Sequence, residues 1–220
     1  GSRHRRLPAT MAPMAWLDVL LASTAVAVAL ALQPWRVVPV LPVPALLCWL
    51  MQPFLWSLDL LSSQPLLQPL AGSCLLMLML GWPMAVLLSL PVAAGVVLLA
   101  DATLAEALQR LVWLGLVPMS LALGLGAALR RWLPNHLFVY ILGRGFFATA
   151  VAVSAAGALS AVLVGAPASL STEDLILARV LAASADAFIT GMLVAIFVAY
   201  KPHWLATYSD RIYLPAAPRV

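Results

Sequence analysis

The stretch Asp-Ala-Phe-Ile-Thr-Gly-Met at residues 186–192 decides the class of this protein. An apolar run follows it, and then Tyr-Lys-Pro-His-Trp-Leu-Ala-Thr-Tyr at residues 200–208. Asp186 has apolar sequence on both sides, and Lys201 is the first cation where the hydrophobic run stops. This pattern predicts one membrane helix that carries a buried acid and ends at a polar, aromatic and basic border.

The composition extends this interpretation to the whole chain. Of the 220 residues, 64% are hydrophobic and 9% are charged, and the mean hydropathy is +1.04. A soluble domain carries about 25% charged residues. The chain is therefore expected to cross a lipid bilayer several times, and its net charge of +4 is expected to mark cytoplasmic loops rather than nucleic-acid binding.

Uncharged runs of about 20 residues predict the membrane spans of an all-α bundle. The expected spans cover residues 15–35, 37–58, 60–80, 82–100, 101–129, 135–165 and 172–200. The break at Gly81-Trp82-Pro83 predicts a tight hairpin inside the uncharged run 60–100, with a single kinked or re-entrant helix as the alternative. We expect seven spans, with six as the alternative.

The expected spans form a single transmembrane domain over residues 15–200. An N-terminal tail, 1–14, is expected to derive partly from an expression tag, and a cytoplasmic C-terminal tail is expected over 201–220. Cys48 and Cys74 both lie in apolar runs and are expected to be small core residues rather than a disulfide or metal ligands.

The loop charges predict an orientation. One side of the expected bundle receives Arg36, Arg130, Arg131, Lys201, Arg211 and Arg219. The other side receives Arg110 and Arg179 and most of the acids, namely Asp59, Asp101, Glu106, Glu173 and Asp174. Positive charge favours the cytoplasmic side, so we expect the N-terminus outside and the C-terminus inside the bacterial inner membrane. The basic residues of the first six positions oppose this assignment if they are native.

Arg144 and Asp186 are the two charges well inside the expected spans. An unpaired charge at the bilayer centre costs at least about 2.5–3.5 kcal/mol, so each is expected to face the protein interior and a partner. The first interpretation is an ion pair that locks the last two helices together. The second is a polar site on a substrate path.

Two further sets of residues lie at the expected inner border. Asn135 and His136 form a polar border site at the start of a span. The basic residues there predict contact with anionic lipid headgroups or with a partner protein; they are Arg130, Arg131, Lys201 and Arg211.

Two segments carry a resemblance to a known family. Asp-Ala-Phe-Ile-Thr at 186–190 resembles an acid-Gly-x-Ile-Thr segment in the last helix of the membrane subunits of energy-coupling-factor (ECF) importers for cobalt and nickel, the CbiM/NikM type. Leu-Ala-Gly-Ser-Cys-Leu-Leu at 70–76, with Leu-Gly-Trp-Pro at 80–83, resembles a Gly-Thr-Ser-x-His-Leu segment of the same subunits. The chain is also similar to predicted bacterial permeases of this type in its Pro-x-Trp border and its Arg-x-Tyr-Leu end. The likeness covers most of residues 65–213 and implies a CbiM/NikM-like bundle.

The metal ligands implied by this resemblance are missing. The family binds its metal with a histidine of the second segment and a Met-His at the mature N-terminus; this chain has Leu75 or Leu76 at the first place and no Met-His start. Arg179 stands where the family has another histidine. Cobalt and nickel favour imidazole ligands, so no metal-binding residue is expected. Co²⁺ or Ni²⁺ is implied by the resemblance alone, and Asn135 is the border residue carried over from it.

The resemblance implies an integral membrane subunit that binds or translocates a small solute or a transition-metal cation. Its energy would come from partner ECF transmembrane and ATPase subunits, since the chain has no Gly-x-x-x-x-Gly-Lys-Ser/Thr motif. The alternative is a membrane assembly or scaffold protein that keeps the fold and has lost the metal site. An enzyme is not expected, because no HExxH or Gly-x-Ser-x-Gly motif occurs.

Overall fold

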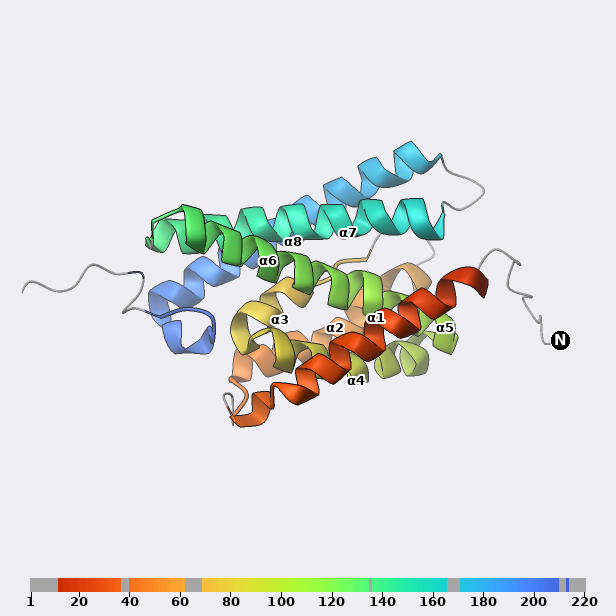
Figure 1. Cartoon of the computed structure of the whole chain (residues 1–220), viewed down its shortest axis with the longest axis horizontal. Coiled ribbons are helices and arrows are strands. Elements are labelled where there is room, and N and C mark those ends of the chain that lie inside the picture. Colours follow the sequence, from red (N-terminus) through yellow and green to blue (C-terminus); the bar gives the residue numbers. More distant parts are fainter. Residues whose placement is uncertain are drawn as a thin grey trace, which may run out of the picture.

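The computed structural model is a bundle of helices (Figure 1) and describes residues 12–36, 40–61, 69–134, 136–165, 171–209 and 213. Seven helices occur in this described part, which contains no strand. They are α1 (Ala12–Ala31), α2 (Val43–Leu61), α3 (Ser73–Leu80), α4 (Trp82–Ala100), the continuous α5 (Leu104–Arg110), η2 (Leu111–Leu116) and α6 (Val117–Trp132), the continuous η3 (Val139–Phe147) and α7 (Ala148–Val164), and α8 (Thr172–Tyr200). Two short 3₁₀ turns, η1 (Pro34–Arg36) and η4 (Pro202–Trp204), follow α1 and α8.

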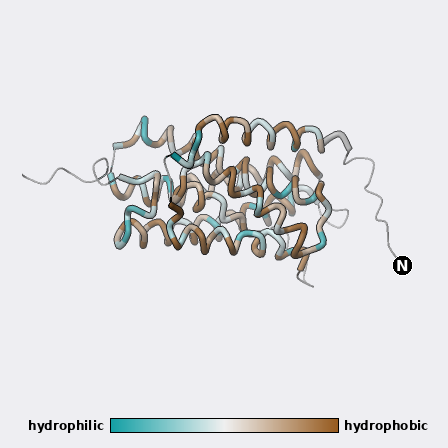
Figure 2. The backbone as a smooth tube through the Cα atoms, turned by 90° about the horizontal axis from the view of Figure 1, so that it is seen from below, coloured by the Kyte–Doolittle hydropathy of each residue, from teal (hydrophilic) through white to brown (hydrophobic). Residues whose placement is uncertain are grey.

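The outer surface of the bundle is apolar. Within the described residues, six helices are long and apolar enough to cross a membrane, and Figure 2 shows hydrophobic residues along the bundle. Large hydrophobic side chains such as Leu47, Leu98 and Phe188 are more than half exposed. Because a water-soluble protein rarely exposes so continuous an apolar surface, the chain is a multi-pass membrane protein, as its composition predicts.

The expected break in the run 60–100 is confirmed. The expected span over residues 60–80 is not one continuous helix, because residues 69–72 are not helical; residues 62–68 lie outside the described residues. Gly81 separates α3 from α4 with φ of 80°, a backbone conformation that glycine adopts without strain. Helix α3 has only eight residues, or about 12 Å of rise, against a hydrocarbon core of about 30 Å. The helix begins in the middle of the bundle and ends at the face where α4 begins (Figure 1).

Helix α3 lies at the centre of the protein. All eight of its side chains are buried, because α2, α4, α6 and α8 surround it. Its sequence is uniformly apolar apart from its first residue, which is typical of a helix without a solvent or lipid face. The hydrophobic sequence therefore marks a buried half-helix here rather than a lipid-facing one.

Small residues allow the long helices to approach closely. Gly145 of η3 packs against Val194 of α8, where an added Cβ would lie 3.3 Å from the valine side chain. Gly115 packs against the Trp56 indole, where an added Cβ would lie 2.9 Å from the ring. Gly115 lies in the π-helical segment η2, and such π-helical insertions occur frequently at functional sites.

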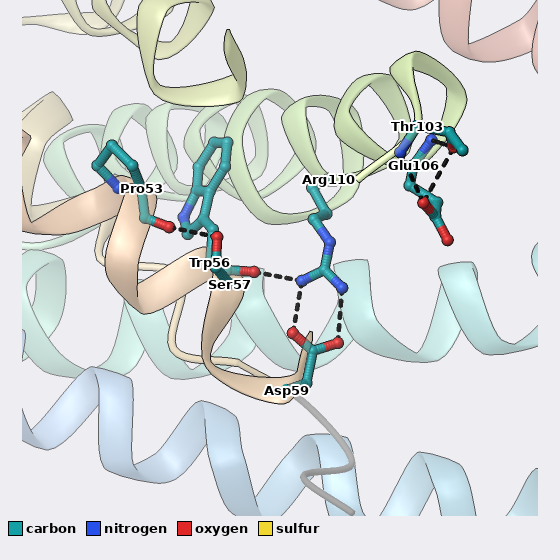
Figure 3. A network of polar contacts seen from close by, with 7 residues as sticks. All are labelled: Pro53, Trp56, Ser57, Asp59, Thr103, Glu106 and Arg110. Carbon is teal, nitrogen blue, oxygen red and sulfur yellow. Dashed lines mark hydrogen bonds and ion pairs between the residues drawn. The ribbon is translucent and has the colours of Figure 1, made fainter. Parts of the chain in front are cut away.

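An ion pair joins α2 to α5 near one end of the bundle (Figure 3). Arg110 donates to both carboxylate oxygens of Asp59, at 2.7 and 2.6 Å, and also to the Trp56 carbonyl. The same end holds the capping box of α5, in which Thr103 and Glu106 satisfy each other's backbone N–H groups. The pair is largely shielded from solvent, with side chains 14% and 22% exposed.

The first part of the expected C-terminal tail packs against the bundle. The N–H groups of Ala206 and Thr207 donate to the Met79 and Leu78 carbonyls at the C-terminal end of α3. Leu205 and Tyr208 are buried. These bonds satisfy carbonyls that the end of a helix leaves free. Residues 205–208 therefore cover the C-terminal end of α3.

Candidate functional site

The buried carboxylate of Asp186 meets the N-terminal end of α3. Asp186 lies in α8 and is 4% exposed. Its two oxygens accept the Gly72 N–H at 3.2 and 3.3 Å. Gly72 has φ of 60°, and this left-handed conformation turns the chain into α3 with its N–H toward the acid. A helix N-terminus carries partial positive charge, so the acid is stabilised there without a cationic side chain.

Polar side chains of α2 hold the non-helical backbone just before α3. The Ala71 carbonyl accepts the Trp56 indole N–H at 2.8 Å and the Gln52 amide at 3.4 Å. On the other side of the break, the Ser73 hydroxyl donates to the Leu114 carbonyl at 2.7 Å. That carbonyl belongs to the π-helical segment η2. Backbone groups outside regular helix are tolerated at this depth only where protein groups or water satisfy them.

Two oxygens near the break have no ordinary hydrogen-bond partner among the described residues. The Gln52 Oε1 atom is buried and unpaired, and the Gln52 side chain lies against Gly72. The Thr149 hydroxyl of α7 is also buried and unpaired, apart from its contact with the Cys74 thiol. Buried polar atoms are normally satisfied, so these two acceptors near the start of α3 are available to a bound cation or to water.

We call this set the central polar site: Gln52, Trp56, Gly72, Ser73, Thr149 and Asp186. Its members come from α2, the start of α3, α7 and α8. The sequence predicts only Asp186 among them. Gln52 is detectable as an amide inside an apolar run, whereas the Gly72 N–H is a backbone group and carries no side-chain signal.

The predicted ion pair between Arg144 and Asp186 is wrong. The Asp186 carboxylate lies at Gly72, while Arg144 donates, among the described residues, to the Thr207 carbonyl at 3.5 Å. The reason is their different heights along the bundle. Gly145 packs beside Val194, which follows Asp186 by about two helical turns, or 12 Å. Arg144 thus belongs to another part of the structure.

The border residues are dispersed over one end of the bundle. Asn135 and Arg211 lie outside the described residues. His136 is exposed; its Nδ1 accepts the Phe138 N–H at 3.3 Å and its ring stacks on Phe138. The basic side chains of Arg130, Arg131 and Lys201 are exposed at the same end. The structure shows no shared site between the histidine and these cations.

No metal site of three or more His, Cys, Asp or Glu side chains occurs within the described ranges. Leu75 and Leu76 are buried in α3. Arg179 of α8, at the other place where the family has a histidine, donates to the Gly157 carbonyl at 2.6 Å. The unpaired atoms near the start of α3 are therefore oxygens of Gln52 and Thr149, and no described histidine contacts Asp186.

No known protein family, curated protein or solved structure matches this chain. The resemblance to cobalt and nickel importer subunits therefore depends on the two segments quoted above. Independently of this resemblance, the chain is a multi-span helical membrane protein.

Proposed function

We propose that this protein is a permease-type membrane subunit that binds a small cationic solute at the central polar site. The observation that carries the proposal is the break before α3, where Asp186 faces backbone that is not helical. Transporters of several folds bind solutes and ions at interrupted helices near the bilayer midplane. An ionisable residue inside a membrane is by default a functional candidate.

The chemistry of the site favours a cation. The carboxylate already occupies the positive end of α3, so this end is not free for an anionic solute. The unpaired atoms, Gln52 Oε1 and the Thr149 hydroxyl, are oxygens. Oxygen ligands suit alkali and alkaline-earth cations, whereas cobalt and nickel prefer nitrogen. The family resemblance implies a transition metal, whereas the oxygen atoms of the site favour a harder cation.

The resemblance also suggests the partners and the energy source. The two segments that resemble importer subunits, residues 70–76 and 186–190, come together in the contact between Gly72 and Asp186. This meeting supports a shared arrangement with the ECF importers, in which partner transmembrane and ATPase subunits supply the energy. We extend the proposal to such partners, and to a bacterial inner membrane with the C-terminus in the cytoplasm, because exposed Arg130, Arg131 and Lys201 gather at one end.

A cation panel tests the proposal. The purified protein is melted in detergent in N-methyl-D-glucamine chloride, with Na⁺, K⁺, Mg²⁺, Co²⁺ or Ni²⁺ chloride added in turn. We expect one cation to raise the melting temperature saturably, and Asp186→Asn to abolish that rise. Asp18→Asn is the matched control, because Asp18 is a buried carboxylate on α1 that accepts the Trp113 indole N–H and makes no hydrogen bond with Gly72 or Gln52 among the described residues.

The competing function is an assembly or scaffold protein in which Asp186 only caps α3. That role predicts no saturable stabilisation by any of the five cations. It also predicts that Asp186→Asn lowers the melting temperature by the same amount in every chloride salt, because the lost cap is independent of the cation. This pattern would refute the proposed solute site.

A further inference from the structure

A second polar feature lies at the basic end of the bundle, apart from the central polar site. It is an open pocket of about 450 Å³. The lining combines the end of α1, the turn between α3 and α4, α6, η3 and the segment after α8. We call it the basic pocket, and its polar character comes from Arg130, Arg144, Thr207 and Ser209. No acidic side chain is among the described residues that line it.

Arg144 is a buried cation with few partners. Its side chain is 7% exposed, and its Nε has no hydrogen-bond partner. Its one hydrogen bond within the described residues is long, 3.5 Å from Nη1 to the Thr207 carbonyl, and the Tyr140 ring lies 5.5 Å away. Arginine stays protonated in proteins, and a buried charge without an opposite charge is costly. No anionic side chain among the described residues therefore pairs with the guanidinium.

The fold makes room for this guanidinium. Gly126 of α6 lies directly beside it, and a Cβ added at Gly126 would be 2.8 Å from Nε. Any side chain larger than hydrogen at this position would displace the arginine. Arg130 lies one helical turn further along α6, on the same lining. Two guanidinium groups facing one cavity repel each other unless an anion lies between them.

From this geometry we infer that the basic pocket binds the phosphate group of an anionic phospholipid. Arginine pairs with phosphate through parallel N–H donors, which gives strong and directional binding. The rim points to lipid as the source of that phosphate. Leu32 and Leu123 line the pocket and are 56% and 40% exposed, so acyl chains can follow the apolar outer surface away from the headgroup.

Lipid binding is measured by native mass spectrometry and by melting, with the full chain in detergent. Dioctanoyl phosphatidylglycerol is the anionic probe, dioctanoyl phosphatidylcholine the zwitterionic one, and inorganic phosphate the soluble one. We expect one phosphatidylglycerol to bind saturably and to raise the melting temperature. The same concentration of phosphatidylcholine or of phosphate should have little effect.

Three variants locate the binding. Arg144→Gln should weaken phosphatidylglycerol binding by about tenfold or more, the usual effect of losing a hydrogen bond to a charged group. Arg130→Gln should weaken it several-fold, and this side chain is exposed, so the fold is retained. Arg131→Gln is the matched control, because Arg131 has the same charge at the same helix end and does not line the pocket.

Equal losses in Arg130→Gln and Arg131→Gln would overturn the pocket in favour of diffuse attraction to the basic end. Equal binding of the two lipids would overturn it as well. If inorganic phosphate stabilises the protein as strongly as phosphatidylglycerol and depends on Arg144 in the same way, the phosphate site stands and the lipid source is refuted.

Discussion

Two double-mutant cycles distinguish the ion pair that the structure contains from the one that it lacks. The first cycle combines Asp59→Asn with Arg110→Gln, the residues that join α2 to α5. The second combines Asp186→Asn with Arg144→Gln, which lie about 12 Å apart along the bundle. The same chemical changes are thus made at a contacting and at a separated pair.

The expected coupling in the first cycle follows from its geometry. Arg110 makes two hydrogen bonds to the Asp59 carboxylate, at 2.6 and 2.7 Å, and both side chains are less than a quarter exposed. A hydrogen bond to a charged group contributes about 1.5–3 kcal/mol. Each single change should therefore cost about 2–3 kcal/mol, and the double change should cost less than the sum by about 1.5–3 kcal/mol. The second cycle should be additive to within about 0.5 kcal/mol.

Equilibrium unfolding in mixed micelles with sodium dodecyl sulfate, followed by circular dichroism, gives the four free energies of each cycle. The wild-type unfolding slope must be kept in every variant for the comparison to hold. A coupling below about 0.5 kcal/mol between Asp59 and Arg110 would contradict the ion pair in Figure 3. A coupling above about 1 kcal/mol between Asp186 and Arg144 would contradict their separation and restore the helix lock predicted from the sequence.

Two further predictions concern packing and orientation. Gly115→Ala places a Cβ 2.9 Å from the Trp56 ring and should destabilise the protein by about 1–3 kcal/mol. Gly124→Ala is the control, because nothing lies within 4 Å of its added Cβ. Equal stability of the two variants would contradict this packing. A reporter fused after Val220 should be cytoplasmic and one inserted at 166–172 should be periplasmic; the opposite labelling would reverse the proposed orientation and place the basic pocket on the outer side.

The sequence by itself determined the class of the protein, because burial in lipid imposes a composition. A chain with 64% hydrophobic and 9% charged residues has too few polar groups for a water-facing surface. Three helix boundaries also follow from local chemistry. Ser171 and Thr103 begin their helices as side-chain caps, and Gly81 breaks the long apolar run.

Only the tertiary structure decided which polar groups meet. Hydropathy is equally high for a lipid-facing helix and for the buried half-helix α3, so the sequence predicts another span over residues 60–80. The sequence predicts a cationic partner for Asp186, because charged side chains can be identified from the sequence. Its partner is instead the backbone N–H of Gly72. Every residue except proline has such an N–H group, and this one is free only because α3 begins there. The depth in the bundle at which a helix starts depends on packing between segments that are distant in the sequence. No local sequence pattern indicates this depth.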